Sequence, residues 1–245
     1  MTTASPFLDL IDIGKTYPGV TALAEVNLSV APGETIGLVG ENGAGKSTLM
    51  KILGGVTAPS KGSIRIDGQD RAEISVTEAT RAGIAFVHQE LNLFENLDVA
   101  ANVFIGREPR YGGLLALVDN KALHAKVTPL LRRLGADFGP AAMVADLSLA
   151  QRQLVEIAKA LSLDARLVIM DEPTSSLTAT ETSRLLDVIA DLKAAGVSVI
   201  FISHRLQEVE RCADRVVVLR DGKVVGRLAR DEIQHDAMIR LMIGR

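Results

Sequence analysis

Apolar residues occur along the chain in short runs separated by polar turns, and their spacing changes from one region to the next. Near the start, residues 7–13 and 24–30 alternate between polar and apolar, which predicts two half-exposed strands around a turn at Pro18-Gly19. A third such strand, 62–68, ends in an Asp-Gly turn. This alternation predicts an antiparallel β portion.

Runs that are mainly apolar predict a second kind of strand. Residues 35–39, 84–88, 166–171 and 197–202 have strand length without alternation, which is typical of strands buried on both faces. A stretch of helix formers, 179–195, lies between the last two. The two strands and this helix therefore predict a βαβ unit with a parallel sheet.

Residues 90–163 are rich in helix formers and carry few strand signals, which predicts an inserted helical subdomain. Within it, 106–113 contains Pro109 and three glycines, and we expect a mobile loop there. The chain continues into a predicted hairpin, 216–225, and an amphipathic segment, 231–243.

Together these elements predict one α/β domain over residues 1–245. Its core and antiparallel β subdomain take 1–89 and 164–230, the helical subdomain takes 90–163, and a C-terminal helix takes 231–245. With 47% hydrophobic and 23% charged residues, a chain of this length can bury a sizeable core.

Charge and cysteine content exclude several classes of protein. The formal charge of −3 argues against a nucleic-acid-binding surface. Cys212 is the single cysteine, so the chain forms neither an internal disulfide nor a thiolate metal site, which is typical of a reducing compartment such as the cytosol. The longest apolar runs are far too short to span a membrane, and residues 1–6 lack a secretory signal. Any role at a membrane would therefore come through a partner.

The most informative motif directly follows the strand predicted at 35–39. It fits the phosphate-binding pattern G-x-x-x-x-G-K-[S/T] and precedes a helix-compatible segment, 47–53. Its backbone amides and Lys46 suit phosphate oxygens, and Ser47 can ligate Mg²⁺. The alternative is an ordinary glycine-rich turn, which the strand, loop and helix order disfavours. The candidate nucleotide-binding residues are Gly40, Glu41, Asn42, Gly43, Ala44, Gly45, Lys46, Ser47 and Thr48.

Two carboxylates, Asp171 and Glu172, follow a buried strand, where ligands bind in open α/β sheets. We expect Asp171 to hold Mg²⁺ through water and Glu172 to orient or deprotonate the water that attacks the γ-phosphate. Taken alone, the pair would instead indicate a solvated turn at the end of a strand.

Polar side chains also follow two other predicted strands. His204 comes after 197–202 and could donate a hydrogen bond to the γ-phosphate, although a lone histidine is usually structural. Gln89 comes after 84–88 and could contact Mg²⁺ or the attacking water, or be an ordinary polar residue at a strand end.

Ser148 stands like a helix N-cap before a helical run, 154–163. A serine there is first of all a cap. The functional alternative is that this helix N-terminus receives a phosphate held by another subunit.

Taken together, these motifs resemble an ATP-binding cassette transporter ATPase over nearly the whole chain. In that family's terms, Gly40–Thr48 is the first nucleotide motif, Gln89 the glutamine loop, Leu147–Gln151 the signature, Leu167–Glu172 the second nucleotide motif, and His204 the switch histidine.

This resemblance implies a RecA-like P-loop NTPase core that binds ATP and Mg²⁺, with Tyr17 stacking on adenine. It also implies a second cassette domain, placed head to tail, whose ATP is closed by Ser148 in trans. Residues 89–102 would transmit the motion to a membrane permease.

The closer similarity is to cassettes that import monosaccharides such as ribose, xylose and galactose, and it rests on the phrases 148–159, 170–178 and 202–209. It implies permease subunits, an extracytoplasmic sugar-binding protein and a peripheral location on the cytoplasmic face of the membrane. Many members of this subgroup join two cassettes, so the chain would be a single cassette or the first half of a tandem one.

Departures from the family pattern and rival functions qualify this reading. Leu149 and Ala150 replace the two signature glycines, and Thr178 replaces an aspartate.

One rival function is that of a soluble cassette ATPase acting on ribosomes or DNA, but the chain lacks the basic linkers or long coiled coils of such proteins. The other is a GTP switch, but Asn120-Lys121 is not followed by the aspartate that would read guanine.

Overall fold

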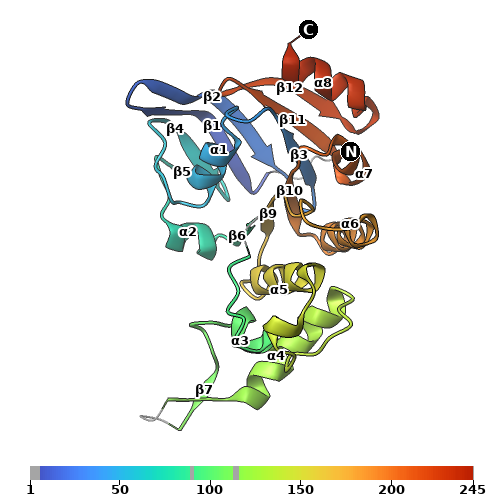
Figure 1. Ribbon diagram of the computed structural model, residues 1–245. Helices are drawn as coiled ribbons and strands as arrows, with labels where there is room; N and C mark the ends of the chain where they lie inside the picture. Colours follow the sequence, from blue (N-terminus) through green and yellow to red (C-terminus); the bar gives the residue numbers. More distant parts are fainter. Residues whose placement is uncertain (1–5, 89–90, 113–115, 245) are drawn as a thin grey trace.

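The structure is a computed structural model that describes residues 6–88, 91–112 and 116–244. A six-stranded sheet forms its centre, in the order β12-β11-β3-β10-β9-β6 (Figure 1). All neighbouring strands are parallel except the β11–β12 hairpin. The strands are β3 (Thr35–Val39), β6 (Ile84–Val87), β9 (Leu167–Asp171), β10 (Ser198–Ile202), β11 (Arg215–Arg220) and β12 (Lys223–Ala229).

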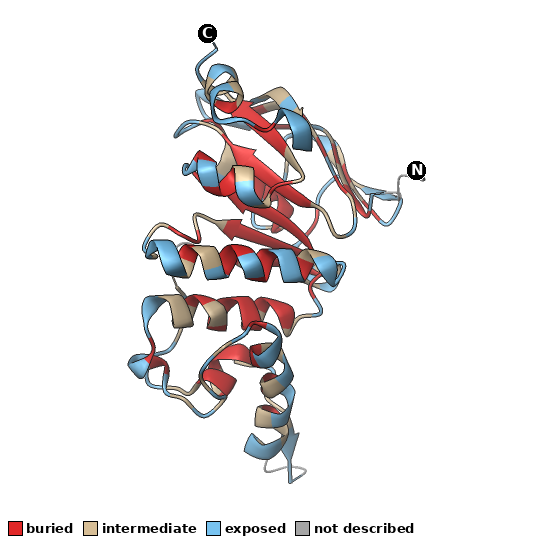
Figure 2. Ribbon diagram, turned by 90° about the vertical axis from the view of Figure 1, so that its right-hand side faces the viewer, coloured by how far each residue is buried: buried red, intermediate tan, exposed pale blue. Residues whose placement is uncertain are grey.

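Side chains alternate between the two faces of this sheet and pack into two separate hydrophobic cores. On β9, Ile169 joins the core that faces a second sheet, whereas Val168 and Met170 join the core that faces the helices. Because both faces are covered, the inner strands β3, β10 and β9 are mainly apolar. Figure 2 shows the inner strands of this sheet buried and surrounding helices with an exposed face.

The second sheet is antiparallel, in the order β2-β1-β4-β5. It comprises β1 (Leu8–Tyr17), β2 (Val20–Val30), β4 (Lys61–Ile66) and β5 (Gln69–Arg71). Helix α1 (Lys46–Leu53) contributes Leu49 and Ile52 to the core between the two sheets. The predicted antiparallel β portion is therefore present, with its first two strands longer than the alternation indicated.

A helical region lies at one end of the molecule, below the central sheet in Figure 1. It holds α3 (Val99–Val103), α4 (Asn120–Arg133) and α5 (Leu149–Leu161). The loop expected at 106–113 is partly strand, because β7 (Arg110–Tyr111) pairs with β8 (Leu117–Val118). These strands were not predicted, because two-residue strands are too short to show a hydrophobic pattern in the sequence.

Four further helices cover the core. They are α2 (Val76–Arg81), α6 (Ala179–Ala194), α7 (Leu206–Cys212) and α8 (His235–Ile243). The amphipathic segment predicted from residue 231 begins with a short 3₁₀ turn, Arg230–Glu232, before α8. Within the described part of the chain, none of the helices combines the length and apolar character needed to span a bilayer.

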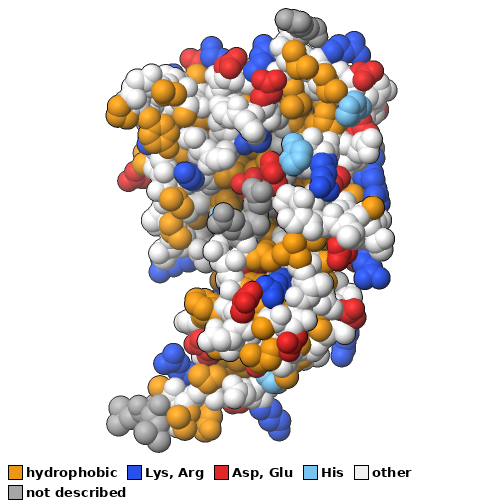
Figure 3. Space-filling model, viewed as in Figure 1, with side chains coloured by type: hydrophobic (Ala, Val, Ile, Leu, Met, Phe, Trp, Pro, Cys, Tyr) orange, Lys and Arg blue, Asp and Glu red, His pale blue; other side chains and the backbone are white. Residues whose placement is uncertain are grey.

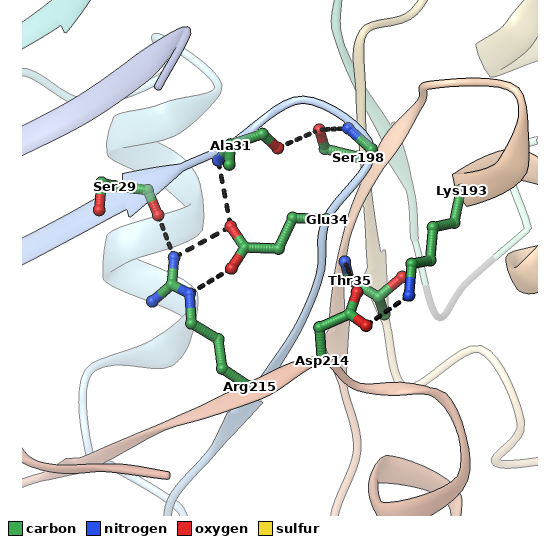
Figure 4. Close-up of polar contacts among 9 residues, drawn as sticks. Ser29, Ala31, Glu34, Thr35, Lys193, Ser198, Asp214 and Arg215 are labelled. Carbon is green, nitrogen blue, oxygen red and sulfur yellow. Dashed lines mark hydrogen bonds and ion pairs between the residues drawn. The ribbon is translucent and has the colours of Figure 1, made fainter. Parts of the chain in front are cut away.

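Ion pairs and hydrogen bonds join the beginnings of the parallel strands (Figure 4). Arg215 at the start of β11 pairs with Glu34, with Nε 2.5 Å from Oε1. Asp214 accepts a hydrogen bond from the backbone N–H of Thr35 at 2.9 Å and pairs with Lys193. Polar contacts thus fix the end of the sheet where the parallel strands begin. The functional site lies at the opposite end, where these strands finish.

Candidate functional site

The phosphate loop connects β3 to α1 and depends on close backbone approaches. Gly45 has φ +105°, in a region that side chains rarely adopt, and a Cβ there would lie 2.7 Å from the carbonyl oxygen of Ala22. The N–H of Gly222 also donates to the carbonyl of Ala44 at 3.1 Å. The hairpin turn and β2 therefore hold the loop from outside.

The first residues of helix α1 line the cleft, and the first N–H groups of a helix have no partner within it. Its N-cap is Gly45, which has no side chain to accept from them. Lys46 folds back over the loop, and its Nζ donates to the carbonyls of Gly40 at 2.7 Å and Glu41 at 3.1 Å. Burial lowers the pKa of Lys46, while the charges of Glu172 and Asp171 oppose that shift. The loop thus presents a cation and free N–H groups to an anion.

The pairing of β9 with β10 brings the predicted acidic and histidine residues together. Asp171 lies opposite Ile202, and the N–H of Glu172 donates to the Ile202 carbonyl at 2.9 Å. The side chain of Glu172 then meets His204, with Oε1 3.3 Å from Nδ1. In the space-filling view, acidic, basic and histidine side chains gather on this face above the helical region (Figure 3).

The carboxylates of Asp171 and Glu172 repel each other when no cation lies between them. Burial, and then the charge of Glu172, raise the pKa of Asp171, and His88 and Lys46 only partly compensate. Glu172 itself has φ +48°, in the left-handed region, which is uncommon for a residue with a side chain. Such crowding of negative charge is relieved when a cation binds.

Lys46, Asp171 and Glu172 line one cleft of about 560 Å³, within the size range of small-molecule sites, and His204 contacts Glu172 without lining the cleft itself. Its lining includes predicted residues from the phosphate loop and from the end of β9. It also includes residues that sequence reasoning missed, from β2 and from the β11–β12 turn. The lining residues are Val20, Thr21, Ala22, Asn42, Gly43, Gly45, Lys46, Ser47, Thr48, Asp171, Glu172, Asp221 and Gly222.

The residues present fit Mg²⁺ held together with phosphates. Ser47 and Asp171 both line the cleft, and Mg²⁺ is usually held by one or two protein ligands plus phosphate oxygens and water. Among residues 6–88, 91–112 and 116–244, no three His, Cys, Asp or Glu side chains gather as an all-protein metal site. The donor set thus suits a metal that arrives with a nucleotide.

Two predicted residues, Ser148 and Tyr17, lie away from this cleft. Ser148 lines a separate groove of about 750 Å³ beside α6. Tyr17 is 39% exposed, lies under Lys15 and does not line the cleft, although Val20, its neighbour across the β1–β2 hairpin, does. Gln89 falls outside the described residues.

Comparison with known families decides the identity of the fold. The sequence profile of the ABC transporter family matches residues 23–175, from β2 to the loop after Glu172. The chain belongs to the ABC transporter family. The predicted resemblance and α/β fold class are therefore confirmed.

Two curated relatives from the ABC transporter family are longer than this chain. It is 50% identical over 241 residues to a putative ribose/galactose/methyl galactoside import ATP-binding protein 1 of Agrobacterium fabrum, covering 98% of this chain and 47% of that protein. It is 47% identical over 240 residues to the ribose import ATP-binding protein RbsA 1 of Rhizobium meliloti, with 98% and 47% covered. The chain spans about half the length of these curated relatives.

Solved structures of ABC transporter cassettes share the fold. The ADP conformation of the cassette MJ1267 superposes with a TM-score of 0.86 at 24% identity, covering 99% of this chain and 100% of that one. A dimeric, post-hydrolysis structure of the cassette MJ0796 bound to ADP and Pi gives 0.76 at 26% identity, covering 91% and 98%.

The departures from the ABC transporter pattern have local structural roles. Thr178 is the N-cap of α6 and forms a capping box with Glu181, whose Oε2 accepts from the Thr178 N–H at 2.9 Å. Ser148 forms the same box with Gln151 at the start of α5, and the adjacent Leu149 is 44% exposed. Both helix starts are thus stable without the usual aspartate or glycines.

Proposed function

We propose that this chain is an ATP-hydrolysing cassette that powers monosaccharide import through a membrane permease. The observation that carries the proposal is the 3.3 Å contact between Glu172 and His204 at the edge of a cleft that also holds Lys46 and Asp171. A carboxylate and an imidazole next to a phosphate loop supply a base and a hydrogen-bond donor for phosphoryl transfer to water.

Each residue would have one task. Lys46 and the amides of 40–48 would bind the phosphates, and Ser47 and Asp171 would hold Mg²⁺, which neutralises phosphate charge. Glu172 would accept a proton from the attacking water, and His204 would donate a hydrogen bond to the γ-phosphate. We assign Gln89 a contact to Mg²⁺ or the water by its place after β6.

A second cassette would complete the site. Ser148 is exposed and lies in a groove apart from the chain's own cleft, which supports its use on ATP held by a partner domain. Closure of two cassettes over ATP, followed by hydrolysis, would then drive the permease. Tyr17, exposed beside the strand that lines the cleft, would stack on adenine.

The transport role rests on the relatives, which are named as ribose or galactose import proteins. By the same likeness we assign permease subunits and an extracytoplasmic sugar-binding protein as partners and a peripheral position at the cytoplasmic face of the membrane. We assign 90–163 as the helical subdomain, with 1–89 and 164–230 as the remainder of the cassette and 231–245 as the C-terminal helix. These names do not favour action on ribosomes or DNA.

The test is Glu172→Gln, assayed over a series of protein concentrations so that pairing of two chains is sampled. Loss of a general base lowers turnover by about 10²–10⁴-fold, whereas ATP affinity should stay within about twofold because the phosphate loop is intact. Glu73→Gln, at an exposed site on another loop, is the matched control. Wild-type turnover in Glu172→Gln, or loss of its ATP binding, would overturn the proposal.

A further inference from the structure

A buried carboxylate lies beneath the two loops that carry the proposed base and the histidine. Glu208, on α7, is 7% exposed. Its Oε2 accepts a hydrogen bond from Thr174 Oγ1 at 2.6 Å and a second from Ser203 Oγ at 3.0 Å. Both hydroxyl residues are themselves buried, at 1% and 4% exposed. One carboxylate oxygen therefore holds two segments that lie 29 residues apart in the sequence.

These two segments are the ones that position the reacting groups. Thr174 follows Glu172 by two residues, and Ser203 directly precedes His204. Hydrogen bonds to an ionised carboxylate are shorter and stronger than those between neutral groups. The separation of Glu172 from His204 is thus fixed from below by Glu208 as well as from the side by the β9–β10 pairing.

Arg205 repeats the same connection. Its Nη1 lies 3.4 Å from Glu208 Oε1, and its Nη2 donates to the carbonyl of Ser175 at 3.2 Å, in the loop after β9. The backbone N–H of Arg205 also donates to Ser203 Oγ at 3.0 Å. The partners of Glu208 therefore form one connected network across both loops, and its charge is compensated.

The backbone of Glu172 explains why such a network is needed. A non-glycine residue at φ +48° persists only when its surroundings determine its conformation. Without the anchor at Thr174, the loop can relax toward commoner backbone angles and carry the Glu172 carboxylate away from its place. A shift of about 1 Å in a catalytic group can cost about 100-fold in rate.

We propose that Glu208 is a positioning residue for ATP hydrolysis, acting through Glu172 and His204 by joining the loops after β9 and β10. The inference rests on the proposed function. It adds a residue that touches neither nucleotide nor water, because Glu208 is buried and does not line the cleft.

The first experiment measures steady-state ATPase kinetics of Glu208→Ala, Glu208→Gln and the control Gln207→Ala, which is exposed on the same helix. We expect kcat of Glu208→Ala to fall about 10–100-fold with KM within about twofold, since the phosphate loop is untouched. Glu208→Gln should restore part of kcat, because its amide oxygen can take the place of Oε2 and accept from both hydroxyls, although without the negative charge. Equal kcat in Glu208→Ala and wild type, or a loss confined to KM, would overturn the inference.

The second experiment asks whether Glu208 acts through the base. In a Glu172→Gln background, Glu208→Ala should lower kcat by less than about threefold, because residues that act as a unit are not additive. A full additional loss would show a separate, purely structural effect and would overturn the inference. Where Glu208→Ala does not fold, Thr174→Val replaces it and removes one hydroxyl from the same carboxylate.

A crystal structure of Glu208→Ala makes the test independent of turnover. We expect Glu172 Oε1 and His204 Nδ1 to separate beyond hydrogen-bond distance, whereas an unchanged contact would overturn the inference. If the wild-type chain shows no ATP turnover, the proposed function fails, but this structural result still decides the role of Glu208.

Discussion

Gly37 lies in the middle of β3, three residues before the phosphate loop, and a methyl group there has no room. A Cβ at this position would lie less than 3.0 Å from Val209 Cγ1 of α7, with Val216 Cγ2 at 3.2 Å and Ala213 Cβ at 3.3 Å. Helix α7 therefore approaches the strand more closely than any residue but glycine permits. Gly37→Ala tests whether this approach limits stability.

The expected magnitude follows from two opposing terms. Overpacking a buried site costs about 1–3 kcal/mol, and replacing glycine by alanine in a strand returns roughly 0.5–1 kcal/mol of backbone entropy. The β-branched side chain of Val209 has one strongly preferred rotamer in a helix, so it cannot rotate away freely. We therefore expect Gly37→Ala to lower the free energy of unfolding by about 1–2 kcal/mol.

The assay is equilibrium urea unfolding of Gly37→Ala, Val209→Ala and the double variant. Val209→Ala removes the methyl groups that obstruct the new Cβ, so the double variant should be more stable than the sum of the single effects by about 1 kcal/mol or more. If Gly37→Ala is as stable as the parent, or if the two effects simply add, the close approach of α7 does not constrain β3.

Two further predictions concern the site. Because burial and Glu172 raise the pKa of Asp171, its proton is bound more tightly in the folded chain than in the unfolded one, and the free energy of unfolding falls as pH rises from about 4 through the folded pKa. In metal-free buffer, Asp171→Asn should therefore be more stable than the parent at pH 7 and equally stable below about pH 4. Thermal unfolding of both proteins across this pH range checks the prediction. A parent that is more stable than Asp171→Asn at pH 7 would contradict it. Ser148→Asp keeps an N-cap for α5 but places a negative charge toward a partner's phosphate, so the melting temperature should stay within about 2 °C while ATP turnover is lost. Retained turnover would contradict the role of Ser148 in trans.

The sequence predicted those parts of the site that depend on local pattern or on a general rule of sheets. The phosphate loop follows from residue types at fixed spacing between a strand and a helix. Asp171 and His204 were expected at the same end of the sheet because parallel strands end together, and the β9–β10 register places Asp171 opposite Ile202, two residues before His204. Gln89 stays a prediction, because it lies outside the described residues.

Other features depend on contacts that no local pattern contains. Glu208 reads as a polar position on a short helix, and only the fold places it under Thr174, 34 residues away. The close packing around Gly37 is equally invisible, since a glycine within an apolar run indicates only a buried strand. Helix α2 did have a signal that was overlooked, the capping box of Ser75 and Glu78.

The left-handed backbone of Glu172 also sets two selective pressures against each other. Glycine adopts φ +48° without strain, so a library screened for thermal stability alone should enrich glycine at position 172. A screen for the proposed ATP turnover should return glutamate at the same codon. Laboratory evolution of this cassette would therefore need both selections, because stabilisation alone would discard the residue proposed to activate water.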